Sequence, residues 1–321
     1  MVNPLILGTM TFGQGDWRAG EREAAALFRS YRDAGGWTFD TADVYGGGAA
    51  EELLGTLVAQ DRCRDDVVIA TKASAPARSG GANARGNGRK HLLAALEGSL
   101  RRLRTDYVDL FWLHLWDGRT PVEDVLLTLD DIVRSGKARA VGLSNVPAWY
   151  AATAVALARA AHQHAPAGLQ LEYSLVERAC EREHAPLAAE TGLSLVPWGP
   201  LAGGLLTGKY RRPGGCSAGR LADPASYPDR RHLTDAERAL IDRLCALSDD
   251  AGVEPAQLAL AWLLQRPAVD AVIVGATSVH QLRSNLGCLD VRLTADQRES
   301  LQAALPESRP GSPYRLFAAA L

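Results

Sequence analysis

Short apolar runs alternate along the chain with longer segments whose apolar residues recur every three or four positions. The runs, which we expect to form strands, are Leu5–Leu7, Trp37–Phe39, Val67–Ala70, Tyr107–Leu113, Ala138–Leu143, Leu169–Leu171, Leu193–Val196 and Ala271–Val274. The longer segments, which we expect to form helices, are Glu21–Ala34, Ala50–Gln60, Arg89–Arg102, Val122–Ser135, Ala148–Ala161, Glu183–Glu190, Asp235–Ala251, Pro255–Gln265 and one from Val279. Strands rich in Val, Ile and Leu that are each followed by a helix are typical of a parallel sheet covered on both faces.

Eight such strand–helix units in one uninterrupted chain predict an α/β protein. We expect a single (β/α)8 TIM barrel domain over residues 1–321, rather than an open doubly wound sheet. Two segments are long for plain connections, Ser74–Gly88 and Leu201–His232. Both follow predicted strands, so we expect long loops on the C-terminal face of the barrel, where barrel enzymes build their sites.

Composition narrows the class of protein. Hydrophobic residues make up 47% of the chain, and 35 Lys and Arg nearly balance 37 Asp and Glu, so no global charge favours nucleic acid or an anionic membrane. The five cysteines are odd in number, widely spaced and without a C-x-x-C motif, which favours reduced thiols over disulfides or a zinc site. No apolar run approaches the roughly 18 residues that span a bilayer, and no signal peptide is evident. We expect a cytoplasmic protein with no nucleic-acid or membrane partner.

Three ionisable residues end consecutive predicted strands: Asp40, Lys72 and His114. Tyr45 follows Asp40 by five residues, so all four side chains should converge at one end of the barrel. A tyrosine with a pKa of ~10 is a poor acid near neutrality, but a neighbouring ammonium lowers that pKa and a carboxylate can hold the ammonium in place. A histidine can polarise the substrate oxygen or orient the phenol. Each residue alone is more often structural, but the set suits protonation of a carbonyl oxygen as hydride reaches its carbon.

Several longer motifs extend this picture over nearly the whole chain. They are LGTMTFG, FDTADVYGGGAAEELLG, IATK, LRRLRTDYVDLFWLH, VRSGKARAVGLSN, LQLEYSLVER, PLAGGLLTGKY and VGATSVHQLRSN. On these motifs the chain resembles the aldo-keto reductase family, and most closely the branch with aryl-alcohol-dehydrogenase-like enzymes, aflatoxin-aldehyde reductases and potassium-channel β-subunits. The resemblance implies the same catalytic tetrad, and it implies NADPH as cofactor, with NADH as the alternative.

The resemblance also implies a cofactor site without the glycine fingerprint of a Rossmann fold. Ser144, Asn145 and Gln170 would hydrogen-bond the nicotinamide carboxamide, and Trp198 would stack on its ring. The other implied cofactor contacts are Gly8, Thr9, Met10 and Asp40 near the nicotinamide ribose; Gly199, Pro200, Leu201, Gly203 and Lys209 around the pyrophosphate; Gly275, Thr277, Gln281 and Asn285 at the adenosine end; and Arg220 on a 2′-phosphate.

The sequence departs from the family pattern at three places. Gly199 stands where the family often has Ser, and Ser284 where related sequences commonly have Glu. The β-hairpin that usually precedes the first strand of the barrel is not evident before Leu5.

Other candidate residues have weaker signals. Phe12, Trp17, Trp116 and Tyr227 could line an apolar substrate pocket, and ordinary packing is an equal alternative for each. The pair His162-x-His164 lacks acidic or cysteine partners at ligand spacing, so we expect a solvated helix end and no metal site.

Three functions compete. The first is an enzyme that reduces a small-molecule aldehyde or ketone with NADPH, with Tyr45 as general acid. The second is a regulatory or redox-sensing subunit that binds NADP(H) and turns over slowly. The third, a metal-dependent hydrolase on the same fold, is disfavoured because no cluster of metal ligands follows the predicted strands.

Overall fold

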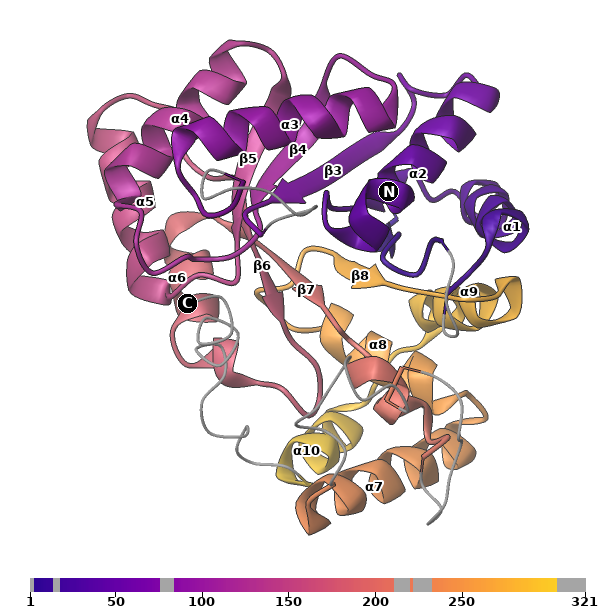
Figure 1. The fold of residues 1–321 in the computed structure, drawn as a ribbon. Helices are drawn as coiled ribbons and strands as arrows, with labels where there is room; N and C mark the ends of the chain where they lie inside the picture. Colours follow the sequence, from indigo (N-terminus) through magenta and orange to yellow (C-terminus); the bar gives the residue numbers. More distant parts are fainter. Residues whose placement is uncertain (1–2, 14–17, 76–83, 211–219, 222–232, 305–321) are drawn as a thin grey trace.

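The protein folds into a barrel of eight parallel strands. The computed structural model describes residues 3–13, 18–75, 84–210, 220–221 and 233–304, and the statements below concern these residues (Figure 1). The strands are β1 (Leu5–Gly8), β2 (Thr38–Asp40), β3 (Val68–Ala73), β4 (Val108–Leu113), β5 (Ala138–Ser144), β6 (Gly168–Glu172), β7 (Ser194–Trp198) and β8 (Val272–Val274). They are hydrogen-bonded in the order β7-β6-β5-β4-β3-β2-β1-β8, so the predicted (β/α)8 barrel is confirmed.

The barrel closes at a narrow seam between β7 and β8. Just before β8 begins, Val269 forms a parallel bridge with Leu195, and the N–H of Asp270 donates to the Leu195 carbonyl over 3.2 Å. This short seam contrasts with the β3–β4 and β4–β5 pairs, which run in register over most of their length.

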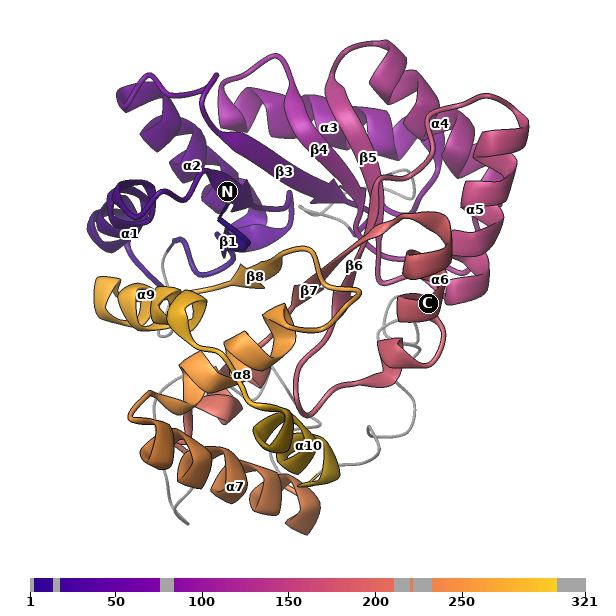
Figure 2. The ribbon, with the colours of Figure 1, turned by 180° about the vertical axis from the view of Figure 1, so that it is seen from behind.

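Helices cover the outside of the strands, as both views of the ribbon show (Figures 1 and 2). They are α1 (Glu21–Asp33), α2 (Ala49–Gln60), α3 (Arg89–Leu103), α4 (Val122–Arg134), α5 (Ala148–Ala160), α6 (His184–Thr191), α7 (Asp235–Ala251), α8 (Pro255–Leu264), α9 (Val279–Leu286) and α10 (Ala295–Ala304). The expected helices are present to within a few residues, whereas α10, which packs on α7, was not predicted. None of the helices in the described part of the chain is long and apolar enough to cross a membrane.

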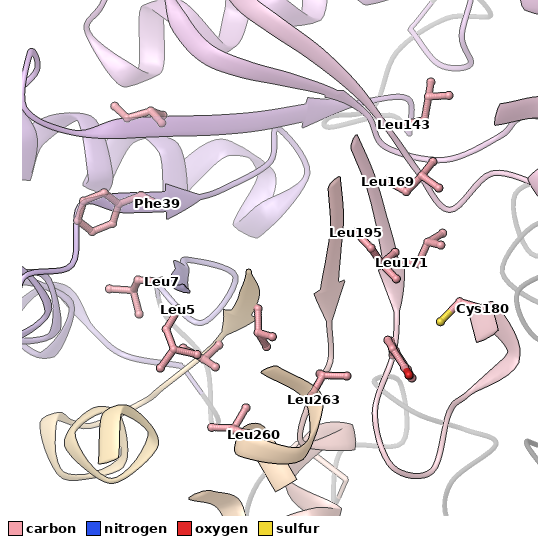
Figure 3. Close-up of a cluster of buried hydrophobic side chains, with 14 of the residues drawn as sticks. Leu5, Leu7, Phe39, Leu143, Leu169, Leu171, Cys180, Leu195, Leu260 and Leu263 are labelled. Carbon is pink, nitrogen blue, oxygen red and sulfur yellow. The ribbon is translucent and has the colours of Figure 1, made fainter. Parts of the chain in front are cut away.

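Successive side chains along each strand point to opposite faces of the sheet, and this divides the buried side chains into two layers. One set of side chains points outward to the helices and forms the large core. Figure 3 shows part of this layer, with Leu143, Leu169 and Leu195 on neighbouring strands and Leu260 and Leu263 contributed by α8. The other set points into the barrel and forms a separate small cluster of Ala70, Trp112, Val196 and Ile273, packed by Ile6, Leu110 and Trp198.

This alternation positions the polar residues. Because side chains two apart share a face of a strand, Lys72 follows Ala70 and His114 follows Trp112 on the inward face. The carboxyl ends of the parallel strands lie at one mouth of the barrel, so these polar groups gather directly above the apolar interior.

The floor beneath the mouth is the indole of Trp112. Its six-membered ring lies over Gly142, its register partner on β5. A Cβ on Gly142 would lie 2.3 Å from the Trp112 ring, so the indole fits only because this position is glycine.

We expect Gly142→Ala to destabilise the protein by about 2 kcal/mol, because the added methyl group must displace a buried ring in a packed interior. Urea unfolding measures the loss. Gly88→Ala is the control, since a Cβ there meets nothing within 4 Å. Equal stability of the two variants would show that the interior has room at Gly142.

Candidate active site

The centre of the site is the ammonium of Lys72, which is 0% exposed. It forms an ion pair with Oδ1 of Asp40 and donates to the carbonyl of Thr41 over 2.7 Å. It also lies 3.2 Å from the phenol oxygen of Tyr45. The structure therefore brings three of the predicted catalytic residues into direct contact.

Asp40 is held from two further sides. Its second carboxylate oxygen accepts a hydrogen bond from Nε2 of Gln170 on β6, over 2.9 Å. Its backbone carbonyl accepts from both the N–H and the hydroxyl of Thr9, over 2.8 and 3.2 Å. Gln170, which the resemblance assigns to the cofactor carboxamide, thus reaches from β6 to the carboxylate of Asp40 on β2.

His114 completes the predicted tetrad on the β4 side. Its ring lies edge-on to Tyr45, with centroids 6.1 Å apart and planes at 85°. The hydroxyl of Ser74 accepts hydrogen bonds from the N–H groups of His114 and Leu115, over 3.1 and 3.3 Å. Among the described residues, Nδ1 of His114 is buried without a hydrogen-bond partner.

Asn145 links His114 to Trp198. Its amide nitrogen donates to the carbonyl of His114 over 3.0 Å and to the hydroxyl of Ser144 over 2.9 Å. Its amide oxygen accepts from Nε1 of Trp198 over 3.0 Å. Asn145 has φ 50°, in the left-handed region that asparagine tolerates better than most residues. The amide predicted to bind the carboxamide therefore also holds the indole predicted to stack on the ring.

The charges of the site follow from burial and proximity. Burial raises the pKa of Tyr45, and the opposing effect of Lys72 is smaller. The ammonium acts in the predicted direction and lowers the pKa of Tyr45. The net pKa is nevertheless raised, because desolvation of a phenolate outweighs one cation that Asp40 already partly neutralises. Burial alone would lower the pKa of Lys72, but Asp40 and Tyr45 together raise it, so the ammonium is charged at neutral pH.

His114 is neutral. Burial and the Lys72 charge lower its pKa to about 3. At neutral pH the imidazole therefore has one ring N–H and one lone pair available for hydrogen bonds.

After β7, the loop predicted to surround the pyrophosphate is built from left-handed residues. Gly199, Gly203 and Gly204 have φ values of 67°, 69° and 95°. The side chain of Lys209 lies against Gly204, where a Cβ would approach its Nζ to 2.7 Å. Left-handed residues that alternate with right-handed ones are typical of loops whose backbone N–H groups bind anions. Within this loop the N–H of Gly204 donates to the carbonyl of Leu201 over 2.9 Å.

The predicted adenosine-end residues gather at the start of α9. The N–H and hydroxyl of Thr277 both donate to Oε1 of Gln281, over 2.9 and 3.0 Å. Asn285 is buried, while Gly275 is exposed after β8. Ser284 stands where related sequences commonly have Glu, and its hydroxyl donates to Glu254 over 2.6 Å.

Arg220 lies at the other side of the mouth. Its Nη2 is 3.7 Å from the sulfur of Met10, and its charge is close enough to Tyr45 to lower the pKa of the phenol. The structure thus places Arg220 beside the residues expected near the nicotinamide ribose.

The aromatic candidates separate. Phe12 is fully buried in the core, which favours packing. Trp116 lies edge-on to Trp149, which is 53% exposed on the rim, with centroids 5.8 Å apart. Trp17 and Tyr227 lie outside the described residues.

The second histidine of the His162-x-His164 pair has an acidic neighbour. His164 contacts Asp130, with Nδ1 2.7 Å from Oδ1. The described residues contain no group of His, Cys, Asp and Glu that could hold a metal.

Several residues that support the site were not predicted from the sequence. Ser74 continues the inward alternation of Ala70 and Lys72, so the same pattern could have identified it. Glu51 is fully buried on α2 and accepts from Arg102 over 2.6 Å, and both lie inside the motifs quoted above. Nothing in the spacing of these motifs indicates that the two side chains meet.

Comparisons with known proteins find similarity over nearly the whole chain. The family model described as "Aldo/keto reductase family" matches residues 4–306. A probable voltage-gated potassium channel subunit beta of Oryza sativa is 36% identical, over 96% of this chain and 94% of its own. The uncharacterized oxidoreductase YrpG of Bacillus subtilis is 34% identical, over 95% and 93%. Norsolorinic acid reductase stcV of Emericella nidulans is 33% identical, over 95% and 79%.

We expect Lys72→Met to destabilise the folded protein by about 3 kcal/mol, because it leaves Asp40 buried without its cation. The double variant Lys72→Met/Asp40→Leu should recover at least half of that loss, since it removes the unpaired carboxylate as well. Urea unfolding of the protein without ligands measures both. A double variant as unstable as the single one would show that the pair is not the source of the loss.

Proposed function

The chain belongs to the aldo/keto reductase family, and from this we propose that it reduces an aldehyde or ketone with NADPH, with Tyr45 donating the proton. It is an oxidoreductase by this membership. The observation that supports Tyr45 as the proton donor is the contact between its phenol and the buried ammonium of Lys72.

The residues present fit a nicotinamide dinucleotide. Trp198 presents a half-buried indole at the mouth, and the loop after β7 combines left-handed glycines with the ammonium-bearing side chain of Lys209 against Gly204. The cofactor, when bound, supplies hydride to the carbonyl carbon. Trp198, Asn145 and Gln170 would hold its nicotinamide end, and the loop from Gly199 to Lys209 its phosphates.

In the proposed mechanism, Tyr45 donates its phenolic proton to the carbonyl oxygen of the substrate. Lys72 stabilises the phenolate that remains, and Asp40 holds the ammonium against Tyr45. Neutral His114 donates a ring N–H to the same oxygen and orients it. The raised pKa of Tyr45 keeps the phenol protonated at neutral pH, as the acid of a reduction must be.

The substrate is proposed as a small carbonyl compound that enters at the C-terminal rim. Trp116, two residues beyond His114 in the chain, lies edge-on to Trp149 there. The two indoles offer an apolar surface to the substrate. We also propose a cytoplasmic location, which fractionation of cells would test.

A second candidate is a regulatory subunit that binds NADP(H) with slow turnover. The 36% identity to a probable potassium channel subunit beta favours it. A protein that binds NADPH but reduces none of a broad carbonyl panel, and that co-purifies with another chain, would support this candidate over the enzyme.

We expect Tyr45→Phe to lower carbonyl-dependent NADPH oxidation by at least about 100-fold, because the ring remains but the proton donor is lost. Absorbance of NADPH follows the reaction across a panel of aromatic and aliphatic aldehydes and ketones. Binding of NADPH, measured by fluorescence, should change little. Unchanged turnover in Tyr45→Phe would rule out this residue as the acid.

We expect Arg220→Ala to weaken binding of NADPH by about tenfold or more while changing binding of NADH much less, if Arg220 pairs with the 2′-phosphate. Titration of the wild type and the variant with NADPH and with NADH gives the ratio of the two dissociation constants. Equal weakening of both cofactors would overturn the pairing with the 2′-phosphate and would instead assign Arg220 to the nicotinamide end, beside Met10. The ratio of the two affinities decides between them.

A further inference from the structure

One buried carboxyl near the catalytic centre has no place in the mechanism above. Asp43 lies in the loop between Asp40 and Tyr45 and is 1% exposed. Among the described residues, neither of its carboxylate oxygens has a partner at good hydrogen-bond geometry, although the N–H of Val44 lies near enough to stabilise the anion. A buried carboxylate without hydrogen bonds is costly unless it is neutral or paired.

A second carboxylate lies behind the same loop. Glu51, in the first turn of α2, is 0% exposed. It accepts hydrogen bonds from the hydroxyl of Thr71 over 2.5 Å and from Nε of Arg102 over 2.6 Å. Glu51 is therefore satisfied as an anion, and Arg102 is the cation beside it.

These groups support the segment that carries Tyr45. The side chain of Arg102 lies against Gly48, where a Cβ would come within 2.6 Å of its Cδ. Gly48 ends the short helical turn that Tyr45 begins. On the other side, the N–H of Asp43 donates to the carbonyl of Lys72 over 3.1 Å, which ties the loop to β3.

We propose that Asp43 is a positioning residue for Tyr45. Its neutral form lets the loop from Thr41 to Gly48 pack against Lys72 and Arg102, and its ionisation weakens that packing. The catalytic part of this inference rests on the proposed role of Tyr45. The physical part does not, because it concerns only the packing of the loop on β3, α2 and α3.

The surroundings give the direction of the effect. Burial raises the pKa of Asp43 to about 7, with the negative charge of Glu51 on α2 acting in the same direction. Arg102 on α3, the N–H of Val44 and Lys72 on β3 oppose this shift and are weaker together. An ionised Asp43 thus adds a second buried negative charge beside Glu51, while Lys72 is already paired with Asp40.

Ionisation of Asp43 makes the folded protein less stable as the pH rises. A carboxyl whose pKa is higher in the folded chain than in the unfolded chain favours folding while it is protonated. That contribution is complete below the unfolded value of 3.8 and is lost as the pH rises through about 7. Asp43→Asn, which stays neutral, should escape this loss.

The first test is thermal unfolding of the whole chain between pH 5 and pH 8.5. The Tm of Asp43→Asn minus that of the wild type should increase by about 3 °C or more across this range. Asp117→Asn is the matched control, because donors from Thr120, Asn87 and Arg119 keep the pKa of Asp117 below 3.8, so its Tm difference should not change with pH. Asp43→Ala should behave like Asp43→Asn and covers the case in which the amide packs badly.

The second test is hydrogen exchange of peptides covering residues 41–48. The ratio of wild-type to Asp43→Asn exchange rates should rise at least threefold from pH 6 to pH 8.5, because taking the ratio cancels the intrinsic pH dependence. Where a carbonyl compound that the protein reduces is known, kcat can be measured at pH 6 and pH 8.5. The ratio of kcat at pH 8.5 to kcat at pH 6 should be at least threefold higher in Asp43→Asn than in the wild type.

A Tm difference and an exchange ratio that are both independent of pH would overturn the proposal, whatever the enzyme does. A pH-dependent Tm difference with unchanged exchange of the loop would also overturn it, because Asp43 would then titrate without moving Tyr45. Neither measurement needs turnover, so loss of the proposed function would leave both results interpretable.

Discussion

The structure of the mouth depends on one buried positive charge. An ammonium without solvent is tolerated only where anionic and hydrogen-bonding partners surround it, and Lys72 has Asp40, the carbonyl of Thr41 and the phenol of Tyr45. Because Gln170 holds the other oxygen of Asp40, this requirement fixes β2, β3 and β6 relative to one another. The barrel frame and the candidate acid are thus set by the same contacts.

The mouth divides into a charged half and a neutral half. Asp40, Lys72 and Tyr45 lie on the side of β2 and β3, and His114, Asn145 and Trp198 lie on the side of β4, β5 and β7. The amide of Asn145 joins the backbone just after β4 to the indole at the end of β7, so the neutral half is a connected hydrogen-bonded group. A polarised carbonyl would meet both halves at the point where Tyr45 and His114 approach each other.

Much of this could be predicted from the sequence because parallel strands bring their carboxyl ends together. Asp40, Lys72 and His114 were expected to converge for that reason alone, and they do. The net pKa of Tyr45 could not be predicted, since it depends on how much packing desolvates the phenol. The contact between Glu51 and Arg102, which are 51 residues apart, and the position of Arg220 depend on how loops and helices settle on the frame. Helix α10 has no strand before it, so the strand–helix alternation did not indicate it.

The indole of Trp112 on Gly142 has a consequence for how this mouth can change shape. The indole fills the space that a side chain at position 142 would need, so the residues at these two positions together set the depth of the mouth. A smaller residue at Trp112 would lower the floor, and a larger one at Gly142 could be accepted only in exchange. Paired substitutions on β4 and β5 can therefore change the depth of the mouth while the residues on its rim and their spacing stay as they are.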